Sequence, residues 1–403
     1  MAVEIIPVET NAQLERFIRV PMRLLAKDPT YVAPLMFERK EALSKKINPF
    51  FQHAEAQFWL ARKNGRDVGR ISAQIDHLAR TDPAAPAGYF GMIAAEDDAE
   101  VFTALFKTAE DWLRARGRIY AQGPFNLSIN EEVGLLVDGF DSPPMLMMGH
   151  DPAFTGRQVE AQGYEKIKDV YAYISEEFAF NSRIETKLNR PLPPGFVLRK
   201  VRMKAFDREV ETMVEIMNDA WSENWGAAPV TQAETKHLAN SLKLILKPDW
   251  IWFAEIDGQA AAFIVLLPNL NEAIRDLKGK LFPFGWAKML WRLKMQPIRS
   301  ARVPLMGVRK AFQRDRRGLL APFFLIDAIR SESVPMGLKS AEYSWILEDN
   351  RPMRHILEGL SARIYKTYRI YGKQIAPLPG EDGAKTDIAG AFGGETPEST
   401  LAM

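Results

Sequence analysis

The chain has 403 residues, 47% hydrophobic and 26% charged, which is typical of a globular protein with room for two domains. The formal net charge of +2 argues against binding through overall charge, and we expect no nucleic-acid partner. Cysteine is absent, which excludes disulfides, thiolate metal sites and a cysteine nucleophile. No signal peptide or bilayer-length apolar run is evident, so we expect a cytoplasmic protein.

The first half alternates strand and helix signals. We predict a strand at 4–8, a helix from Thr10 that Pro21 interrupts, and a hairpin over 58–75 around an Asn64-Gly65 turn. A helix follows over 99–116, because its apolar residues share one face and Gly117 can end it.

The second half gives the same signals in the same order. We predict a strand at 197–201, a helix near 210–221, and a helix through Leu246 that a Thr231/Glu234 capping box opens. A hairpin around Asp257-Gly258, a strand at 303–308 and a helix over 319–329 follow.

These signals indicate an internal repeat. Trp59 and Gly65 correspond to Trp252 and Gly258 at an offset of 193 residues (252 − 59), and similar aromatic strands end both halves. The repeated order predicts an α/β fold with a mixed sheet, made of two tandem domains. We place them at 1–180 and 196–375, with a linker at 181–195 and a disordered tail at 376–403.

This order resembles the GNAT fold of N-acyltransferases. The resemblance implies that a fourth strand ends in a loop whose amides hold the coenzyme A pyrophosphate at a helix N-terminus. In the second half we expect that loop at 313–318, where Arg314, Arg316 and Arg317 surround the phosphate and Gly318 permits close approach. Asp315 and Leu320 depart from the family pattern, because an amide or arginine and a small residue are usual there.

The corresponding loop of the first half is acidic. It contains Glu96, Asp97, Asp98 and Glu100, and one carboxylate about 5 Å from a phosphate costs roughly 3 kcal/mol at an effective dielectric of about 20. We therefore expect the acyl-CoA site in the second half, and read the acidic loop as a helix cap. There Gly307 and Val308 would hold the donor and stabilise the oxyanion.

The end of the second half adds three candidates. The resemblance assigns Asn350 to the donor site, and it also fits a helix cap before Pro352. Tyr365 matches the family tyrosine that protonates the leaving thiolate, or is an ordinary core tyrosine. Glu348 is a candidate base toward the amine, or a surface charge at a strand end.

A polar loop in the first half, from Gly123 to Pro144, supplies further candidates. Asn126 and Ser128 are predicted to bind substrate, and Asn130 and Glu131 to act in catalysis, with Glu131 as an alternative base. The same residues also fit a capped turn. We include His150 as a catalytic candidate, although a lone histidine is more often structural.

A basic and aromatic segment precedes the expected phosphate loop. From 277 to 317 there are twelve Lys or Arg residues and one acid, interleaved with large apolar side chains that include Trp286 and Trp291. This composition fits an interfacial membrane helix over 277–299 or the wall of an acyl-chain pocket. A core helix with a solvated basic face is the structural alternative. No metal-ligand spacing connects the five histidines, and we expect no metal and no permanently bound cofactor.

The runs GYFGMIAAEDDAEVF and QGPFNLSINEEVGLLVDGFDSPP resemble a closer group, the tandem GNAT proteins that include the bacterial ceramide synthases. The resemblance implies N-acylation of a sphingoid base by a long-chain acyl thioester, with acyl-CoA or an acyl carrier protein as donor. The amine would attack the thioester directly, and the protein would be peripheral on the inner membrane. The alternatives are an aminoacyl transferase of the FemABX type, which uses tRNA, and a non-catalytic acyl-CoA or lipid binder. The sequence leaves the oligomeric state open.

Overall fold

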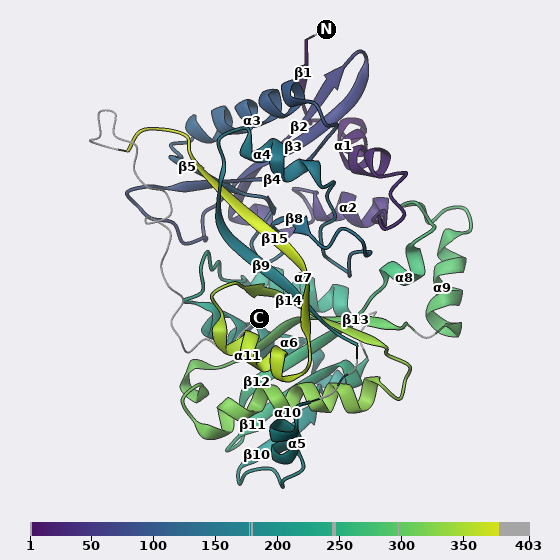
Figure 1. Cartoon of the computed structure of the whole chain (residues 1–403), viewed down its shortest axis with the longest axis vertical. Coiled ribbons are helices and arrows are strands. Elements are labelled where there is room, and N and C mark those ends of the chain that lie inside the picture. The colour runs from purple at the N-terminus through teal and green to yellow at the C-terminus, as the bar shows by residue number, and fades with distance from the viewer. Residues whose placement is uncertain (1, 177, 179, 244–246, 297, 379–403) are drawn as a thin grey trace. The chain divides into compact units, whose positions relative to one another are not determined.

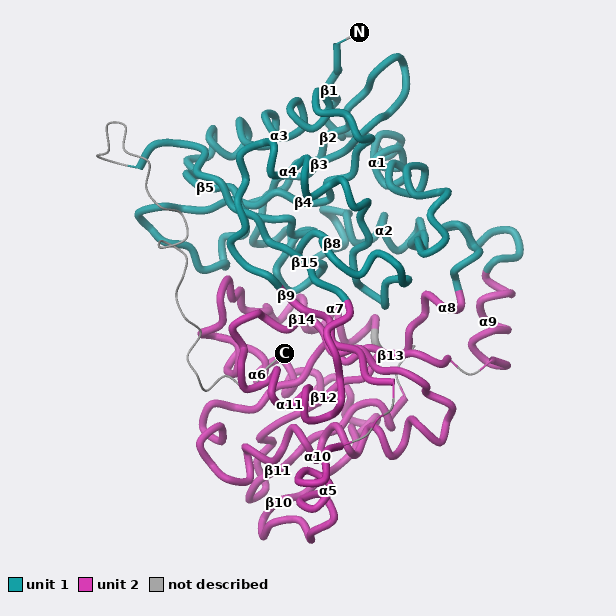
Figure 2. The backbone as a smooth tube through the Cα atoms, in the orientation of Figure 1, with its two compact units in different colours: residues 1–169, 274–285, 366–394 teal, residues 170–273, 286–365, 395–403 magenta. Residues whose placement is uncertain are grey.

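The computed structural model of the chain describes residues 2–176, 178, 180–243, 247–296 and 298–378 (Figure 1). These residues form two compact units, and the chain passes between them several times (Figure 2). Unit 1 contains residues within 1–169, 274–285 and 366–378, and unit 2 those within 170–273 and 286–365. The domain limits at 1–180 and 196–375 were predicted from the repeat in the sequence, and they stay a prediction. Most of the predicted tail, 379–403, lies outside the described residues.

Unit 1 is built on a mixed sheet with the strand order β1-β2-β3-β4-β5-β15. Neighbouring strands are antiparallel, except that β4 and β5 are parallel, and β8 also pairs with β15. The strands are β1 (Glu4–Pro7), β2 (Ala54–Lys63), β3 (Arg66–Asp76), β4 (Ala87–Ala95), β5 (Tyr120–Gly123), β8 (Leu135–Asp138) and β15 (Arg363–Gln374). The helices are α1 (Asn11–Leu24), α2 (Met36–Ala42), α3 (Ala99–Arg114) and α4 (Phe154–Glu160), and a short hairpin joins β6 (Phe125–Asn126) to β7 (Glu132–Val133).

Both faces of the unit 1 sheet are buried. Trp59 and Ala61 on β2 belong to a core with the apolar face of α3, whereas Phe58 and Leu60 belong to a core with Phe17 of α1. Side chains alternate between the two faces of a strand, so one strand contributes to both cores. This double burial explains why β4, with the sequence AGYFGMIAA, is a nearly continuous apolar run.

Unit 2 repeats this plan with the strand order β9-β14-β13-β12-β11-β10, in which β13 and β14 are the parallel pair. Its strands are the second half of β9 (Glu165–Ser175), β10 (Phe196–Lys200), β11 (Ile251–Ile256), β12 (Gln259–Pro268), β13 (Ser300–Val308) and β14 (Ser340–Leu347). Its helices are α5 (Ser182–Leu188), α6 (Phe206–Trp221), α7 (Gln232–Lys243), α9 (Gly285–Met295), α10 (Arg316–Ser333) and α11 (Arg351–Gly359), and α8 (Asn271–Ile274) ends in unit 1.

The hairpin turns confirm the repeat at the level of the backbone. Asn64 and Gly65 have φ values of 53° and 74°, and Asp257 and Gly258 have 50° and 81°. Two successive positive φ values define the type I′ turn that matches the twist of a hairpin. Asn, Asp and Gly adopt this conformation at low cost, which is why the sequence located both turns correctly.

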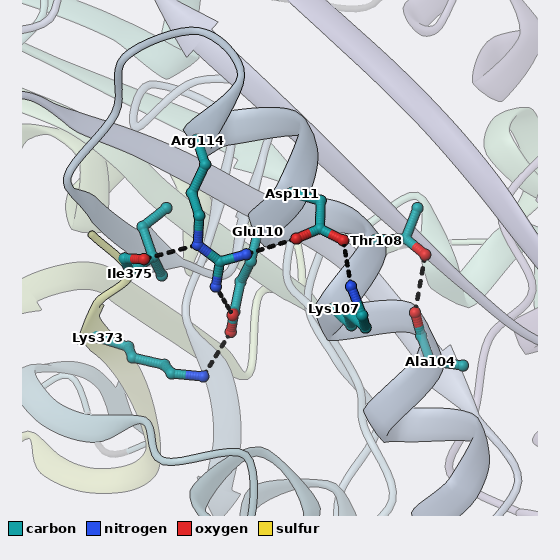
Figure 3. A network of polar contacts seen from close by, with 8 residues as sticks. All are labelled: Ala104, Lys107, Thr108, Glu110, Asp111, Arg114, Lys373 and Ile375. Atoms are coloured by element: carbon teal, nitrogen blue, oxygen red, sulfur yellow. Dashed lines mark hydrogen bonds and ion pairs between the residues drawn. The ribbon is translucent and has the colours of Figure 1, made fainter.

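The last strand of each sheet comes from a distant part of the sequence. β9, near the middle of the chain, pairs with β14 in unit 2, and the end of β15 pairs with β5 in unit 1. A polar network attaches β15 to α3 (Figure 3). Glu110 accepts hydrogen bonds from Lys373 and Arg114, each at 2.7 Å, and Arg114 also donates to the Ile375 carbonyl at 2.6 Å. The final strand is thus part of the unit 1 fold.

Two predicted segments differ from the structure, and a third is confirmed where the structure describes it. The predicted linker contains α5, because Asn181 caps a helical turn by accepting from the Ile184 amide at 3.0 Å. Helix α10 begins at Arg316 instead of 319, so half of the expected phosphate loop is the first helical turn. The Thr231 capping box is confirmed, with the Thr231 amide 2.8 Å from Glu234, but Leu246 lies outside the described residues.

Candidate functional site

The parallel strands of unit 2 separate part of the way along their length. β13 and β14 pair over four residues and stop at Val303 opposite Tyr343. Immediately afterwards both strands shift register against their outer neighbours, at Pro304 in β13 and at Ser344–Trp345 in β14. Bulges bend a strand and end its pairing, and proline has no N–H to give to a ladder. The result is a fork, which we call the unit 2 fork, with Pro304–Val308 on one side.

A buried polar network lies at the base of the unit 2 fork. Arg302 and Glu342 are 1% and 0% exposed, and their Nε and Oε1 atoms are 3.5 Å apart. The Ser344 hydroxyl accepts from Arg302 Nε at 2.8 Å and donates to Glu342 Oε1 at 2.6 Å. The half-buried Tyr365 donates its hydroxyl proton to the other oxygen of Glu342. This set, the Glu342 network, brings one predicted residue together with three unpredicted ones.

The predicted phosphate-binding arginines differ in their surroundings. Asp315 caps α10 by accepting from the Arg317 amide at 2.7 Å, so a carboxylate already occupies the first turn. The Arg317 guanidinium is bound by Asp315 and Asp257, each at 2.9 Å, and these contacts raise its pKa and lower that of Asp315. Arg314 and Arg316 lie exposed beside this turn. These two are therefore the arginines best able to meet a diphosphate.

Close packing explains the glycine of this loop. A Cβ atom on Gly318 would come within 2.0 Å of the Phe312 carbonyl oxygen, so a larger residue would displace the backbone. Gly307 and Val308 end β13, and a Cβ on Gly307 would make ordinary contacts with α6, such as 3.6 Å to Ile216. Gly307 thus does not require glycine for space, whereas Gly318 does.

The structure confirms the predicted cap at the end of β14. Asn350 is buried and accepts from the Met353 amide at 3.2 Å, at the start of α11. Glu348 directly follows β14 and is partly exposed, and its carbonyl oxygen accepts from Arg354 at 2.7 Å. The side chains of Asn350 and Glu348 thus lie at the end of β14, beyond the bulge.

In unit 1 the corresponding fork is occupied by the chain itself. β4 and β5 part after Tyr89 opposite Gln122, and β6 packs against β4 beyond that point. The Met92 amide, at a bulge with φ of 50°, donates to Asn126 at 2.7 Å. A Cβ on Gly91 would come within 1.8 Å of the Phe125 carbonyl oxygen. The backbone of β6 therefore lies against β4 at the point where β4 and β5 part.

The acidic loop of unit 1 acts as a helix cap. Asp98 accepts from the Glu100 amide at 3.0 Å at the start of α3. Lys63 lies 2.6 Å from Asp98, and Arg157 lies 3.0 Å from Asp97. These ion pairs neutralise the loop within unit 1, which supports the capping interpretation.

A second polar group, which we call the Glu132 cluster, lies in unit 1. Glu132 accepts from Arg39 at 3.0 Å and from the Asn126 amide at 2.7 Å. The side chains of Arg39 and Glu132 are 27% and 22% exposed. Burial is the largest single influence on both pKa values, because it lowers the pKa of Arg39 and raises that of Glu132, although the opposite charges outweigh it. Arg39 nevertheless holds the pKa of Glu132 below its usual range.

Three further ionisable residues interact electrostatically with this cluster. Burial raises the pKa of Asp151 to about 7 and that of Tyr31 to about 12, and it lowers the pKa of Arg70 to about 10. Glu132 also raises the pKa of Asp151, whereas Arg70 and the Leu136 amide lower it. A carboxyl group that titrates near neutral pH can exchange protons under working conditions.

The remaining first-half candidates form a local turn. Ser128, buried, accepts from the Asn130 amide through its hydroxyl and from the Glu131 amide through its carbonyl, each at 3.1 Å. These contacts are those of the capped turn considered from the sequence. The neighbouring Glu132, which the sequence reasoning passed over, is the glutamate that meets Asn126 across the β6–β7 pair.

His150 is bound on one side by another carboxylate. Its side chain is 2% exposed, and Nε2 lies 2.9 Å from Asp28 and 3.2 Å from the Thr30 hydroxyl. This contact and the hydroxyl of Thr30 lower the pKa of Asp28 to about 2, against the opposing effect of burial. Such contacts are typical of a structural histidine that stabilises a loop through hydrogen bonds.

The predicted basic and aromatic segment is highly exposed. Trp286 and Trp291 on α9 are 46% and 56% exposed, and Phe282 just before the helix is 81% exposed. None of the helix residues is buried. The structure thus contradicts the alternative of a core helix.

Two of the site residues that were not predicted, Arg302 and Glu342, share a signal in the sequence. Arg302 and Glu342 are charged residues inside strands that are otherwise apolar, SARVPLMGV and SAEYSWIL. A charge at such a position must find a buried partner. Searching both parallel strands for such charges would have identified this pair. Arg39 and Asp151 carried no comparable signal, because Arg39 lies in the helix α2 and Asp151 lies in an irregular segment before α4.

Metal and membrane sites can be assessed within the described residues. There, no group of three or more His, Cys, Asp or Glu side chains is placed to hold a metal ion. None of the described helices combines the length and apolar character needed to cross a bilayer.

The fold and the forked parallel strands define a class, the tandem GNAT proteins. Two solved structures resemble the chain, each with 13% identity and a TM-score of 0.55. A tandem GNAT protein from the clavulanic acid biosynthesis pathway matches 93% of this chain and 99% of its own. The GCN5-related glucosamine N-acetyltransferase region of a fungal multi-domain β-N-acetylglucosaminidase matches 92% of this chain and 38% of its own. These likenesses confirm the fold.

Sequence comparison identifies the family within that class. The chain is 56% identical over 373 residues to the bacterial ceramide synthase of Caulobacter vibrioides, covering 92% of this chain and 97% of that protein. It is 44% identical to the protein YghO of Escherichia coli, covering 90% and 93%. No family model matches the chain. The chain therefore belongs to the bacterial ceramide synthase family, and it is an N-acyltransferase.

Proposed function

We propose that the protein transfers a long-chain acyl group from a thioester, acyl-CoA, to the amine of a sphingoid base. The observation that carries this proposal is the 56% identity to a bacterial ceramide synthase over nearly its whole length. Identity at this level over 92% of this chain and 97% of that protein supports a shared reaction and a shared substrate class. The absence of cysteine fits direct attack of the amine on the thioester.

The donor is assigned to unit 2. Its fork is opened by two bulges, whereas Phe125 and Asn126 fill the unit 1 fork. Arg314 and Arg316 are exposed at the first turn of α10 and would bind the diphosphate. Arg317 would stabilise this turn through its ion pairs with Asp257 and Asp315. Gly307, Val308 and Asn350 complete the donor side of this proposal, with backbone amides near Gly307 as the oxyanion site.

The remaining roles follow from residue chemistry. Tyr365 would protonate the departing thiolate, and Glu348 or Glu131 would take the ammonium proton. Asn126 and Ser128 are proposed for the amine substrate, with Asn130 and His150 as supporting residues. The Glu132 cluster beside Asn126 adds carboxylates that suit an ammonium group.

The membrane is the proposed source of both lipid substrates. α9 exposes Trp286 and Trp291 among lysines and arginines, and aromatic and cationic side chains together favour an anionic lipid surface. Wild-type protein should cosediment with phosphatidylglycerol vesicles, and Trp286→Ser/Trp291→Ser should reduce the bound fraction at least tenfold. Phe37→Ser, at a residue 55% exposed on α2, is the matched control. Full retention by the double variant would refute this docking surface.

A direct assay tests the reaction. Purified protein is incubated with palmitoyl-CoA and sphinganine, and free thiol and N-palmitoyl product are followed together. Stoichiometric appearance of both is expected. Failure to release thiol with any long-chain amine would refute the acyl-transfer reaction, and binding of acyl-CoA without turnover would favour a sensor. Salt-dependent binding of charged tRNA, with transfer of its aminoacyl group, would instead favour the FemABX-type alternative.

A further inference from the structure

Burying the charged groups of the Glu342 network has a desolvation cost, and a purely structural role does not readily explain it. Arg302 and Glu342 are almost completely buried in the unit 2 sheet, where they form the last but one residue pair before the fork. Replacing a buried ion pair by apolar side chains of similar size is often neutral or stabilising, so a network of this kind is weak evidence of a stabilising role. Its position at the fork and its connection to Tyr365 suggest a chemical role instead.

The two oxygens of Glu342 contact different hydroxyl groups. The Ser344 hydroxyl donates to Oε1 at 2.6 Å and is itself held by Arg302 Nε at 2.8 Å. Tyr365 donates to Oε2. The arginine and the serine thus hold the carboxylate with Oε2 directed at the phenol. A phenol that already donates to a carboxylate can pass its own proton inward while it accepts another.

We propose that Tyr365 and Glu342 form a proton relay that carries one proton from the attacking amine to the departing sulfur. This inference rests on the proposed acyl transfer and on the proposed donor site in unit 2. It differs from the assignment of separate acid and base residues, because a single relay serves both steps. Glu342 acts through Tyr365 and is a positioning residue, whereas Tyr365 meets the reacting atoms.

The steps balance as follows. The neutral amine, having lost its first proton to solvent or to another base, attacks the thioester carbon, and a C–N bond forms while the carbonyl oxygen becomes an oxyanion. The nitrogen gives a proton to Tyr365 Oη as the phenolic proton moves to Glu342 Oε2. The oxyanion then restores the carbonyl and breaks the C–S bond. Glu342 returns its proton to Tyr365, which protonates the sulfur, so amide and free thiol are formed and the relay is unchanged.

The relay makes a prediction that a simple acid does not. If Tyr365 alone protonated sulfur, loss of the Glu342 carboxylate would affect only stability and orientation. If the two act as one unit, either loss removes the same function, and the double variant should be no worse than the single ones.

The test uses the full-length protein with palmitoyl-CoA and sphinganine at saturation. Tyr365→Phe, Glu342→Gln and the double variant are compared with Tyr173→Phe, a tyrosine elsewhere in unit 2 that is 3.1 Å from Arg354. Each variant is first checked by thermal unfolding and by acyl-CoA binding. We expect kcat to fall about 100-fold for the first three variants, the size of a general acid–base contribution. Tyr173→Phe should stay within about twofold.

The split between kcat and KM provides a readout that a structural role would not move. Tyr365→Phe and Glu342→Gln should lower kcat alike, while KM for palmitoyl-CoA and for sphinganine stays within about twofold of the wild-type values. A rise in KM with unchanged kcat would mean that the two residues only shape the binding site, and it would refute the relay.

Each outcome decides a different statement. Wild-type protein that releases no thiol would refute the proposed function. Active wild-type protein with Tyr365→Phe within about threefold of it would refute the relay alone. Additive losses in the double variant would likewise refute it, and if Glu342→Gln fails to fold, the activity of Tyr365→Phe decides.

Discussion

Asp151 gives the sharpest prediction about stability, because its carboxyl group is neutral over most of the acidic range only when the protein is folded. Burial raises its pKa to about 7, whereas an aspartate in an unfolded chain titrates near 3.9. Between these values the folded protein binds one proton more than the unfolded chain. The free energy of unfolding therefore falls as pH rises through this window, and the loss is complete above about pH 7.

The magnitude follows from the width of the window. A difference of about three pKa units at about 1.4 kcal/mol each gives roughly 4 kcal/mol, an upper value because Asp151 retains some solvent contact. Asp151→Asn is neutral in both states, and its amide oxygen can keep the 3.1 Å hydrogen bond from the Leu136 amide. The variant should therefore match the wild type below about pH 4, exceed it by about 1 kcal/mol at pH 4.5, and exceed it by about 2–4 kcal/mol at pH 8.

Urea unfolding of both proteins at pH 4.5, 6 and 8, monitored by a probe within unit 1, measures this difference. Asp138→Asn is the matched control, since Asp138 is exposed at the end of β8. A stability difference between Asp151→Asn and wild type that stays constant from pH 4.5 to 8 would refute the reasoning. The same variant assayed for acyl transfer shows whether this carboxyl also takes part in the reaction.

Three further predictions concern the loop at the start of α10, where the donor is proposed to bind, and the attachment of β15 to unit 1. Arg314→Ala/Arg316→Ala should raise KM for palmitoyl-CoA about tenfold, through loss of charge-assisted contacts to the diphosphate, with little change in KM for sphinganine; unchanged KM for both would move the donor elsewhere. Gly318→Ala should destabilise unit 2 by about 1–3 kcal/mol in urea unfolding, because its Cβ would lie 2.0 Å from a carbonyl oxygen. Wild-type stability would contradict the close approach. Glu110→Gln removes the charge that holds two basic side chains and should lower unit 1 stability by about 1–3 kcal/mol and speed proteolysis near the end of β15; an unchanged cleavage rate would argue against this attachment.

Local features were readable from the sequence because their causes lie within a few residues. The Asn64-Gly65 turn, the Thr231 capping box and the Asn350 cap each depend on side chains and backbone that are adjacent in the chain. Periodicity likewise predicted α3, whose buried residues follow its apolar face. The tandem repeat was evident because both copies carry these local signals in the same order.

The candidate site was only partly predictable. Tyr365 and the arginines of the α10 turn were identified by resemblance to a family, but their partners were not. Glu342 accepts from Tyr365, and Asp257 binds Arg317, across 23 and 60 residues of sequence. No local pattern connects such residues, because a buried charge is stabilised by whichever groups the fold brings to it.

The sequence by itself determined that this protein is a repeated α/β fold with its turns, caps and amphipathic helices in known places, since short-range sterics and hydrogen bonding dictate them. The tertiary structure decided which strand completes each sheet, which of the two forks is occupied by β6, and which charges are buried. Those features depend on long-range pairing, where bulges such as the one at Pro304 and packing such as that of Phe125 against Gly91 select one arrangement among several compatible with the same local preferences.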